Sequence, residues 1–74
     1  MKHTTNIKRL NQSAEMDRSV AADLNAEVID GRATEYEVRE GFQPGYIANL
    51  AMYFDDNAER LEKKAKELES NYAK

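Results

Sequence analysis

Apolar residues recur along the C-terminal half of the chain at alternating steps of four and three. They begin just after Gln43-Pro44-Gly45 and are Ile47, Ala51, Phe54, Ala58, Leu61, Ala65, Leu68 and Tyr72. Only a helix places residues with this spacing on one face. The spacing therefore predicts a long helix over about 45–73, with these eight residues as its packing seam. Because alanines alternate with larger side chains along the seam, a neighbouring helix can approach closely.

One segment inside this predicted helix resembles a helix start. Asp55-Asp56-Asn57 is followed by Glu59, and this order of acidic and amide residues is typical of an N-cap. A break here would normally reset the phase of the apolar seam, and the phase is kept. We therefore expect one continuous helix, with a kink at 55–57 as the alternative.

The first half of the chain has a weaker apolar pattern. Ser13 is a suitable N-cap, and Asp30-Gly31 is a typical helix end. Four apolar residues lie four positions apart between these signals: Met16, Val20, Leu24 and Val28. This pattern predicts a first helix over about 13–30 that packs through these four residues.

Residues 1–12 contain Lys2, Lys8 and Arg9 and no acidic residue, so we expect a basic, flexible N-terminal arm. The alternative is a longer first helix, since Ile7, Leu10 and Ala14 extend a second apolar stripe. That stripe would also have to contain Asp17.

Two interpretations compete for residues 31–43. Thr34-Glu35-Tyr36-Glu37 has the spacing of a capping box, which favours a short helix up to Gly41. The alternation of Thr34, Tyr36 and Val38 with charged residues instead favours a strand, in a hairpin over 27–38. We prefer the helix, because a lone two-stranded hairpin is marginally stable in water. The sequence thus predicts a small all-α domain over 13–74, with an α+β fold as the alternative.

The predicted domain has little core. A chain of 74 residues seldom gains more than about 3–5 kcal/mol from a single core. A first helix of about 16 residues spans roughly 24 Å and covers only part of a neighbour of roughly 42 Å. The remaining seam needs cover, and a second copy of the chain in a homodimer is the simplest candidate. A different protein, or solvent around a frayed end, are the alternatives.

Composition argues against most catalytic and metal-dependent functions. The chain has no cysteine and a single histidine, His3, near the N-terminus. These counts argue against disulfides, thiolate metal sites, most zinc sites and histidine-based catalysis. The three glycines are scattered and form no phosphate-binding loop. We therefore expect a protein that is not an enzyme and that uses no cofactor, metal or small-molecule substrate.

No segment has the length and apolar character of a membrane span, which needs about 20 residues. The N-terminal residues lead into no apolar run, so we expect no export signal, a cytoplasmic location and no membrane partner.

Charge is unevenly distributed along the chain. The net charge is −3, composed of +3 over residues 1–14, −8 over residues 15–59 and +2 over residues 60–74. The acidic block repels nucleic acid, because proteins bind phosphates mainly through Lys and Arg. It attracts a basic protein surface and speeds the encounter with it. Direct nucleic-acid binding is therefore not expected, although the basic N-terminal arm leaves a DNA-binding regulator as a weaker alternative.

These features favour a non-enzymatic protein-binding module, a stoichiometric inhibitor or regulator that docks on a basic surface of a larger protein. If that surface normally holds nucleic acid, the carboxylates stand in for phosphates. The candidate acidic contacts are Glu35, Glu37, Glu40, Asp55, Asp56 and Glu59. Tyr46 and Tyr53, seven residues apart, are the candidate aromatic anchors. The alternative function is a self-associating helical protein, with a homodimer as the working unit.

Overall fold

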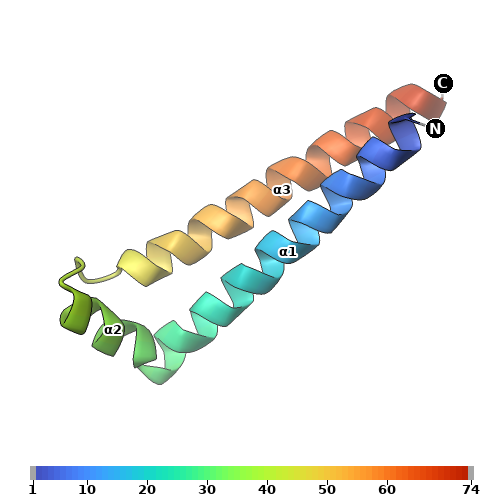
Figure 1. Cartoon of the computed structure of the whole chain (residues 1–74). Coiled ribbons are helices and arrows are strands. Elements are labelled where there is room, and N and C mark those ends of the chain that lie inside the picture. Colours follow the sequence, from blue (N-terminus) through green and yellow to red (C-terminus); the bar gives the residue numbers. More distant parts are fainter. Residues whose placement is uncertain (1, 74) are drawn as a thin grey trace.

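The computed structural model describes the backbone of residues 2–73 and the side chains of residues 5–71. It contains three helices, α1 (Lys2–Asp30), α2 (Arg32–Glu40) and α3 (Tyr46–Ala73). Helices α1 and α3 lie side by side and antiparallel, so both termini are at one end and α2 is at the other (Figure 1). Residues 2–73 form no strand. The all-α prediction is confirmed, and the hairpin alternative at 27–38 is wrong.

Helix α3 has the extent that its apolar spacing predicts. It runs from Tyr46 to Ala73 and continues without interruption through 55–57. Along its seam Ile47, Ala51, Ala58 and Ala65 are buried, and Phe54, Leu61 and Leu68 are half-buried. The eighth predicted seam residue, Tyr72, lies outside the described side chains.

Helix α1 begins much earlier than its capping pattern suggests. It starts at Lys2, so the predicted start at Ser13 is wrong. The predicted packing face is also wrong, because Met16 is 70% exposed and Val20 is 38% exposed. The buried and half-buried positions of α1 instead follow the second stripe, and they are Ile7, Leu10, Ala14, Asp17, Ala21, Leu24 and Glu27.

Asp17 is accommodated in this stripe because α3 supplies its partner. The side-chain Nδ2 of Asn57 donates a hydrogen bond to Asp17 Oδ2 at 2.6 Å. A polar group is costly at a helix interface only when it lacks such a partner. The stripe that contains Asp17 can therefore pack against α3 along its whole length. Residues 2–12, which the sequence analysis treats as a flexible arm, form the first turns of α1. Their flexibility remains a prediction.

Helix α2 begins at Arg32, two residues before the Thr34 that the capping-box pattern indicates. Gly31 precedes it with φ of 87°, in the left-handed region that glycine readily adopts. Gly31 is the N-cap and has no side chain to bond the helix start, but Oδ1 of Asp30 accepts the Arg32 backbone N–H at 3.0 Å. Its Oδ2 accepts the Arg32 side-chain Nε–H at 2.7 Å. The predicted break at Asp30-Gly31 is thus where α1 ends and α2 begins.

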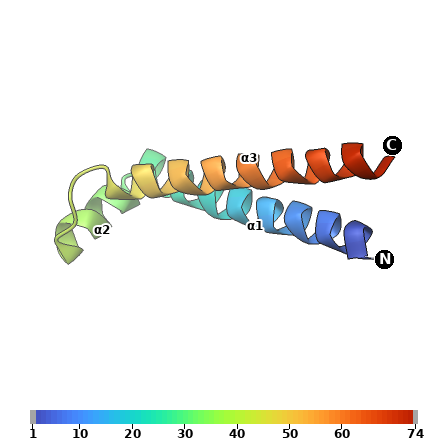
Figure 2. The ribbon, with the colours of Figure 1, turned by 90° about the horizontal axis from the view of Figure 1, so that it is seen from above.

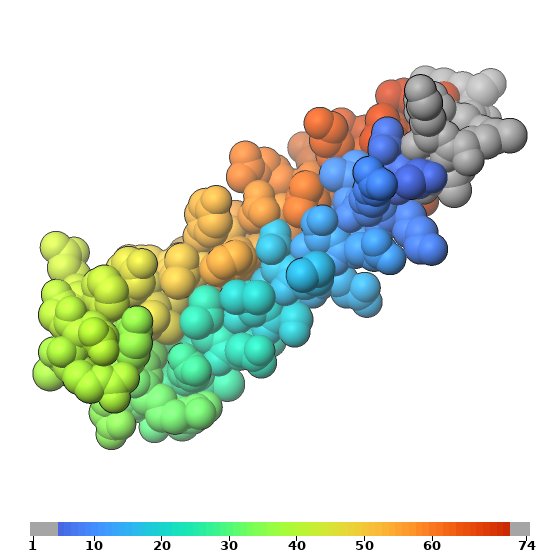
Figure 3. Space-filling model, viewed as in Figure 1, coloured from blue at the N-terminus to red at the C-terminus, as the bar shows by residue number. Residues whose placement is uncertain are grey.

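The core consists almost wholly of alanine. Its buried apolar residues are Ala14, Ala21, Ala33, Ile47, Ala51, Ala58 and Ala65, and no large side chain is fully buried among the described residues. Small side chains at the contact let the axes of α1 and α3 approach closely. The helices touch along their length, and α2 adds bulk only at one end (Figure 3).

The molecule is consequently narrow and has a large surface. It measures 52 × 18 × 14 Å, and the view from above shows the same elongated shape, with α1 and α3 at a shallow angle to each other (Figure 2). Its radius of gyration is 16.1 Å, whereas a compact domain of this length has about 11 Å. Its accessible surface is 5885 Å², against roughly 4,700 Å² for a compact protein of this mass. The two-helix contact therefore leaves much side-chain surface uncovered.

Ala58→Leu tests the close approach of the two helices. Ala58 has no exposed surface, so the larger side chain has to push α1 away. We expect the free energy of unfolding to fall by about 1–3 kcal/mol, measured by urea denaturation. The matched control is Ala22→Leu on the exposed side of α1, for which we expect a change within about 0.5 kcal/mol. Equal effects of the two substitutions would contradict an alanine-packed interface.

Candidate acidic protein-binding face

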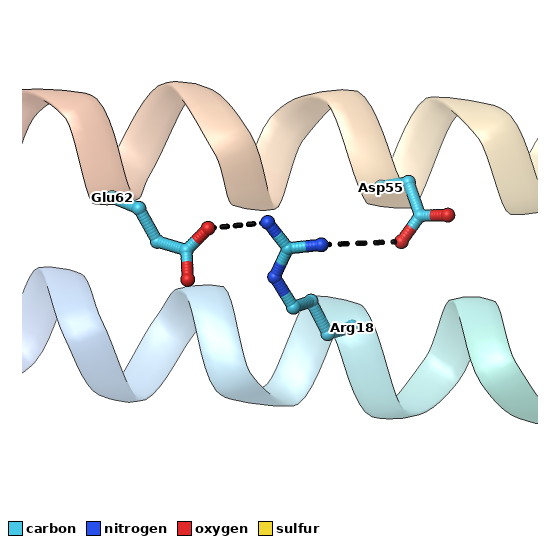
Figure 4. Close-up of polar contacts among 3 residues, drawn as sticks. All are labelled: Arg18, Asp55 and Glu62. Atoms are coloured by element: carbon cyan, nitrogen blue, oxygen red, sulfur yellow. Dashed lines mark hydrogen bonds and ion pairs between the residues drawn. The ribbon is translucent and has the colours of Figure 1, made fainter.

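A bridging arginine joins α1 to α3 on one side of the hairpin. The Arg18 guanidinium donates from Nη2 to Glu62 Oε1 and lies with Nη1 3.8 Å from Asp55 Oδ1 (Figure 4). In Figure 4 α3 is again above α1, but the blue end of α1 is on the left. The picture therefore views the side opposite to that of Figure 1.

This ion pair changes the proton affinity of both partners. The hydrogen bond from Arg18, and then its charge, lower the pKa of the Glu62 carboxyl below the ordinary value of 4.5. The same hydrogen bond raises the pKa of Arg18, and the charges of Glu62, Asp55 and Glu59 raise it further. Since all these groups are accessible to water, screening by solvent keeps the interaction modest.

Carboxylates gather on this side of α3 and on its outer side, which faces away from α1. Asp56 and Glu59 share a hollow on the outer side with Arg60 and Lys63. Asp55, Asp56, Glu59 and Glu62 occupy two successive turns, and we call these four residues the acidic face. Among the described residues, Arg18 forms ion pairs with two members of the acidic face, Asp55 and Glu62. Met52, which is 63% exposed, lies one turn before Asp55 and Asp56 on α3. Three of the six predicted acidic contacts therefore come together here, and Glu62 joins them.

Glu37 is buried and does not belong to the acidic face. It is 5% exposed, and its carboxylate points to the start of α3. Oε1 accepts the Gly45 N–H at 3.2 Å, and Oε2 accepts the Ile47 N–H at 2.7 Å. Glu37 thus caps α3 from a different helix and has almost no surface to offer a partner. The missed signal is at 43–45, where Gln43-Pro44-Gly45 supplies no side-chain cap for the α3 N–H groups.

Glu35 and Glu40 lie on α2, at the end of the rod, and are exposed. Asp55 is nine residues into α3, or about 13 Å along the helix from its start. The Arg39 Nε lies 3.5 Å from Glu40 Oε1. The structure therefore does not unite the acids of α2 with the acidic face.

The aromatic candidates lie on the other side of α3. Tyr46, Leu50 and Tyr53 are spaced by four and three residues, about half a helical turn around α3 from Asp55 and Glu59. Tyr53 is 60% exposed, and its ring meets Phe54 edge-on at 5.6 Å between centroids. The sequence-predicted acidic and aromatic contacts therefore form two separate surfaces.

Tyr46 belongs to an aromatic stack that joins α2 to the start of α3. Its ring is 4.6 Å from Phe42, which is 5.7 Å from Tyr36. The stack borders a hollow of about 390 Å³, lined by Leu24, Glu27, Tyr36, Phe42, Tyr46, Ile47 and Leu50. These residues come from all three helices and from the connection between α2 and α3, and they share no sequence period, so local spacing does not predict the hollow.

Neither a metal centre nor a membrane span is found in the described part of the chain. The described residues contain no group of three or more His, Asp or Glu side chains placed to hold a metal ion. None of the described helices combines the length and apolar character needed to cross a bilayer.

Comparisons with protein-family models, with curated proteins and with solved structures find no match to this chain.

The Arg18–Glu62 pair predicts a pH-dependent contribution to stability. Because the pKa of Glu62 is lowered in the folded protein, the contribution is complete above the ordinary value of 4.5. It is lost as the pH falls through the lowered pKa. We expect Arg18→Gln to be less stable than the parent at pH 7 and the difference to shrink below pH 4.5, measured by urea denaturation. The control is Lys8→Gln, because the exposed Lys8 has no acidic residue three or four positions away on α1. Its difference from the parent should not follow this course, and a constant deficit for Arg18→Gln would contradict the pairing.

Glu37→Ala tests the cap of α3. The substitution leaves the Gly45 and Ile47 N–H groups without their carboxylate acceptor, so we expect a loss of about 2 kcal/mol in the free energy of unfolding. The control is Glu35→Ala on the exposed side of α2, with an expected change within about 0.5 kcal/mol. Similar values for the two variants in thermal and urea denaturation would contradict the capping role.

Proposed function

We propose that this chain is a non-enzymatic protein-binding module that acts as a stoichiometric inhibitor or regulator. In this proposal the acidic face docks on a basic surface of a larger protein in the cytoplasm. The observation that carries the proposal is that the four carboxylates of the acidic face lie within two turns of α3. Among the described residues, Arg18 forms ion pairs with two of them. Such a concentration of one charge speeds encounter with a surface of opposite charge.

The acidic face suits this role better than the acids of α2. On α2, Glu37 is buried as a cap, and Glu40 has Arg39 beside it. Arg32 is a further cation on this short helix, and it pairs with Asp30. The acids of α2 are therefore buried or lie beside an arginine of α2, whereas the acidic face is accessible, with Arg18 as its ion-paired cation and Arg60 and Lys63 beside Asp56 and Glu59 on the same helix.

Met52 adds an apolar contact at the edge of the acidic face. Charged contacts at an interface mainly set the rate and selectivity of association, while buried apolar side chains supply most of the affinity. An exposed methionine next to carboxylates provides both kinds of contact on one surface. Its flexible thioether also adapts to irregular partner surfaces.

A basic surface that holds nucleic acid is the partner type that fits this proposal best. Such a surface presents Lys and Arg spaced for phosphates, and carboxylates along a helix can occupy the same positions. Binding of the chain and of nucleic acid would then be mutually exclusive. This competition is how a small protein without catalytic groups can inhibit a larger one.

The double substitution Asp56→Lys/Glu59→Lys tests the acidic face. The partner is first captured from extract of the source cells, then purified and titrated with the chain by calorimetry. We expect one chain per binding site, an affinity that falls as salt rises, and at least a tenfold loss for the double variant. A short DNA duplex should compete with the parent chain.

The matched control is Glu35→Lys/Glu40→Lys, which makes the same charge change on α2 and should retain most of the affinity. The proposal fails if binding is insensitive to salt, or if the α2 variant loses as much affinity as the α3 variant.

A further inference from the structure

The hollow beside the aromatic stack is lined by three separate parts of the chain. It lies where the end of α1, helix α2 and the start of α3 meet (Figure 1). We call it the aromatic hollow. Its volume is about 390 Å³, and its lining is Leu24, Glu27, Tyr36, Phe42, Tyr46, Ile47 and Leu50. A mostly apolar lining with few polar groups is typical of pockets that bind a ligand.

The aromatic stack already binds a guanidinium at one of its ends. Phe42 lies between the rings of Tyr36 and Tyr46, and all three side chains are between 39% and 42% exposed. Arg39 lies over the Tyr36 ring, with its guanidinium carbon 5.6 Å from the ring centroid. Tyr46, at the other end, contacts the Phe42 ring, and no cation contacts Tyr46 within the described part of the chain. The stack therefore has one end with a guanidinium and one end without.

Glu27 is the charged residue of the lining. It is half-buried, and among the described residues no hydrogen bond or ion pair reaches it. Arg32 and Arg39 line an adjoining hollow of about 280 Å³ together with Glu27, but each has another carboxylate as its partner. The Arg32 Nε lies 2.7 Å from Asp30 Oδ2, and the Arg39 Nε lies 3.5 Å from Glu40 Oε1. The Glu27 carboxylate is therefore open to a cation that enters the aromatic hollow.

We propose that the aromatic hollow binds an arginine side chain of a partner protein. The guanidinium stacks on Tyr46 and pairs with Glu27, and the aliphatic stem lies against Leu24 and Leu50. The contact at Tyr46 repeats at one end of the stack what Arg39 does at the other. Arginine fits better than lysine, because its planar guanidinium stacks on aromatic rings and offers a carboxylate two parallel N–H donors.

Charge selects a side chain of a protein as the occupant. Residues 27–40 contain five acidic residues and two arginines, a net charge of −3, so this end of the rod attracts a cation. The lining itself holds a carboxylate and no positively charged group. The α-carboxylate of free arginine would therefore have no partner there, whereas an arginine within a polypeptide carries no such charge.

The aromatic hollow is separate from the acidic face. Tyr46 and Leu50 lie about half a helical turn around α3 from Asp55 and Glu59. The hollow therefore supplies a second contact with its own chemistry. This inference goes beyond the proposed function and does not rest on it.

A titration with blocked arginine tests the ligand. N-acetyl-arginine methylamide is added to the isotope-labelled, purified chain, and the NMR signals of Leu24, Glu27, Tyr46 and Leu50 are followed. We expect these signals to shift in a saturable way. The citrulline analogue is similar in size but neutral, and it should bind roughly tenfold more weakly. The lysine analogue should bind more weakly than the arginine analogue, and free arginine should bind no more tightly.

Two pairs of variants test the residues of the hollow. Glu27→Gln keeps the size of the side chain and removes its charge, so blocked arginine should bind roughly fivefold more weakly. The matched control Asp23→Asn removes a charge one turn earlier on α1, outside the lining, and should keep the parent affinity. Tyr46→Leu removes the ring and should weaken binding, whereas Tyr46→Phe keeps the ring and the affinity. Circular dichroism checks that each variant keeps its helices.

Any of four results would overturn the proposal. They are the absence of saturable shifts at the hollow, equal binding of the citrulline or lysine analogue, tighter binding of free arginine, and equal effects of Glu27→Gln and Asp23→Asn. In the variant Glu59→Gln, on the acidic face, binding of blocked arginine should be unchanged. A failure of the hollow to bind arginine is therefore distinct from a failure of the acidic face to bind its partner.

Discussion

The close packing of α1 against α3 through alanine is the interaction on which the rest of the structure depends. Ala14 and Ala21 of α1 meet a seam of Ala51, Ala58 and Ala65 on α3, and all five are buried. Alanine allows a short distance between helix axes but buries little area per residue. The contact therefore fixes a straight and narrow hairpin while it leaves both sides of each helix uncovered. The acidic face lies on one of these uncovered sides.

The sequence was sufficient to predict α3 and insufficient for α1, for a physical reason. Every seam position of α3 is apolar, so its period can be recognised without knowledge of a partner. The seam of α1 contains Asp17, which is acceptable only because Asn57 donates a hydrogen bond to it from α3. A contact between residues 40 positions apart has no signal in local spacing. The exposed Met16 and Val20, in contrast, have a regular spacing that indicates the wrong face.

The candidate site could likewise be predicted only where its residues share one helix. The carboxylates of α3 share one helix, so their common side follows from the helical period. The role of Glu37 does not, because it depends on α2 folding back against the start of α3. The aromatic stack of Tyr36, Phe42 and Tyr46 likewise requires two turns of the chain to bring its rings together. Features within one helix could be predicted, whereas features that join helices required the structure.

Amide hydrogen exchange along α1 and α3 tests the alanine-packed hairpin most directly. If α1 packs against α3 over its full length, the amides of Leu10 and Ala65, near the termini, should be protected to a similar degree as those of Ala21 and Ala51. Protection reports the local free energy of opening. Free exchange at Leu10 and Ala65 beside protected Ala21 and Ala51 would contradict the account, because α1 would then pack only through its second half.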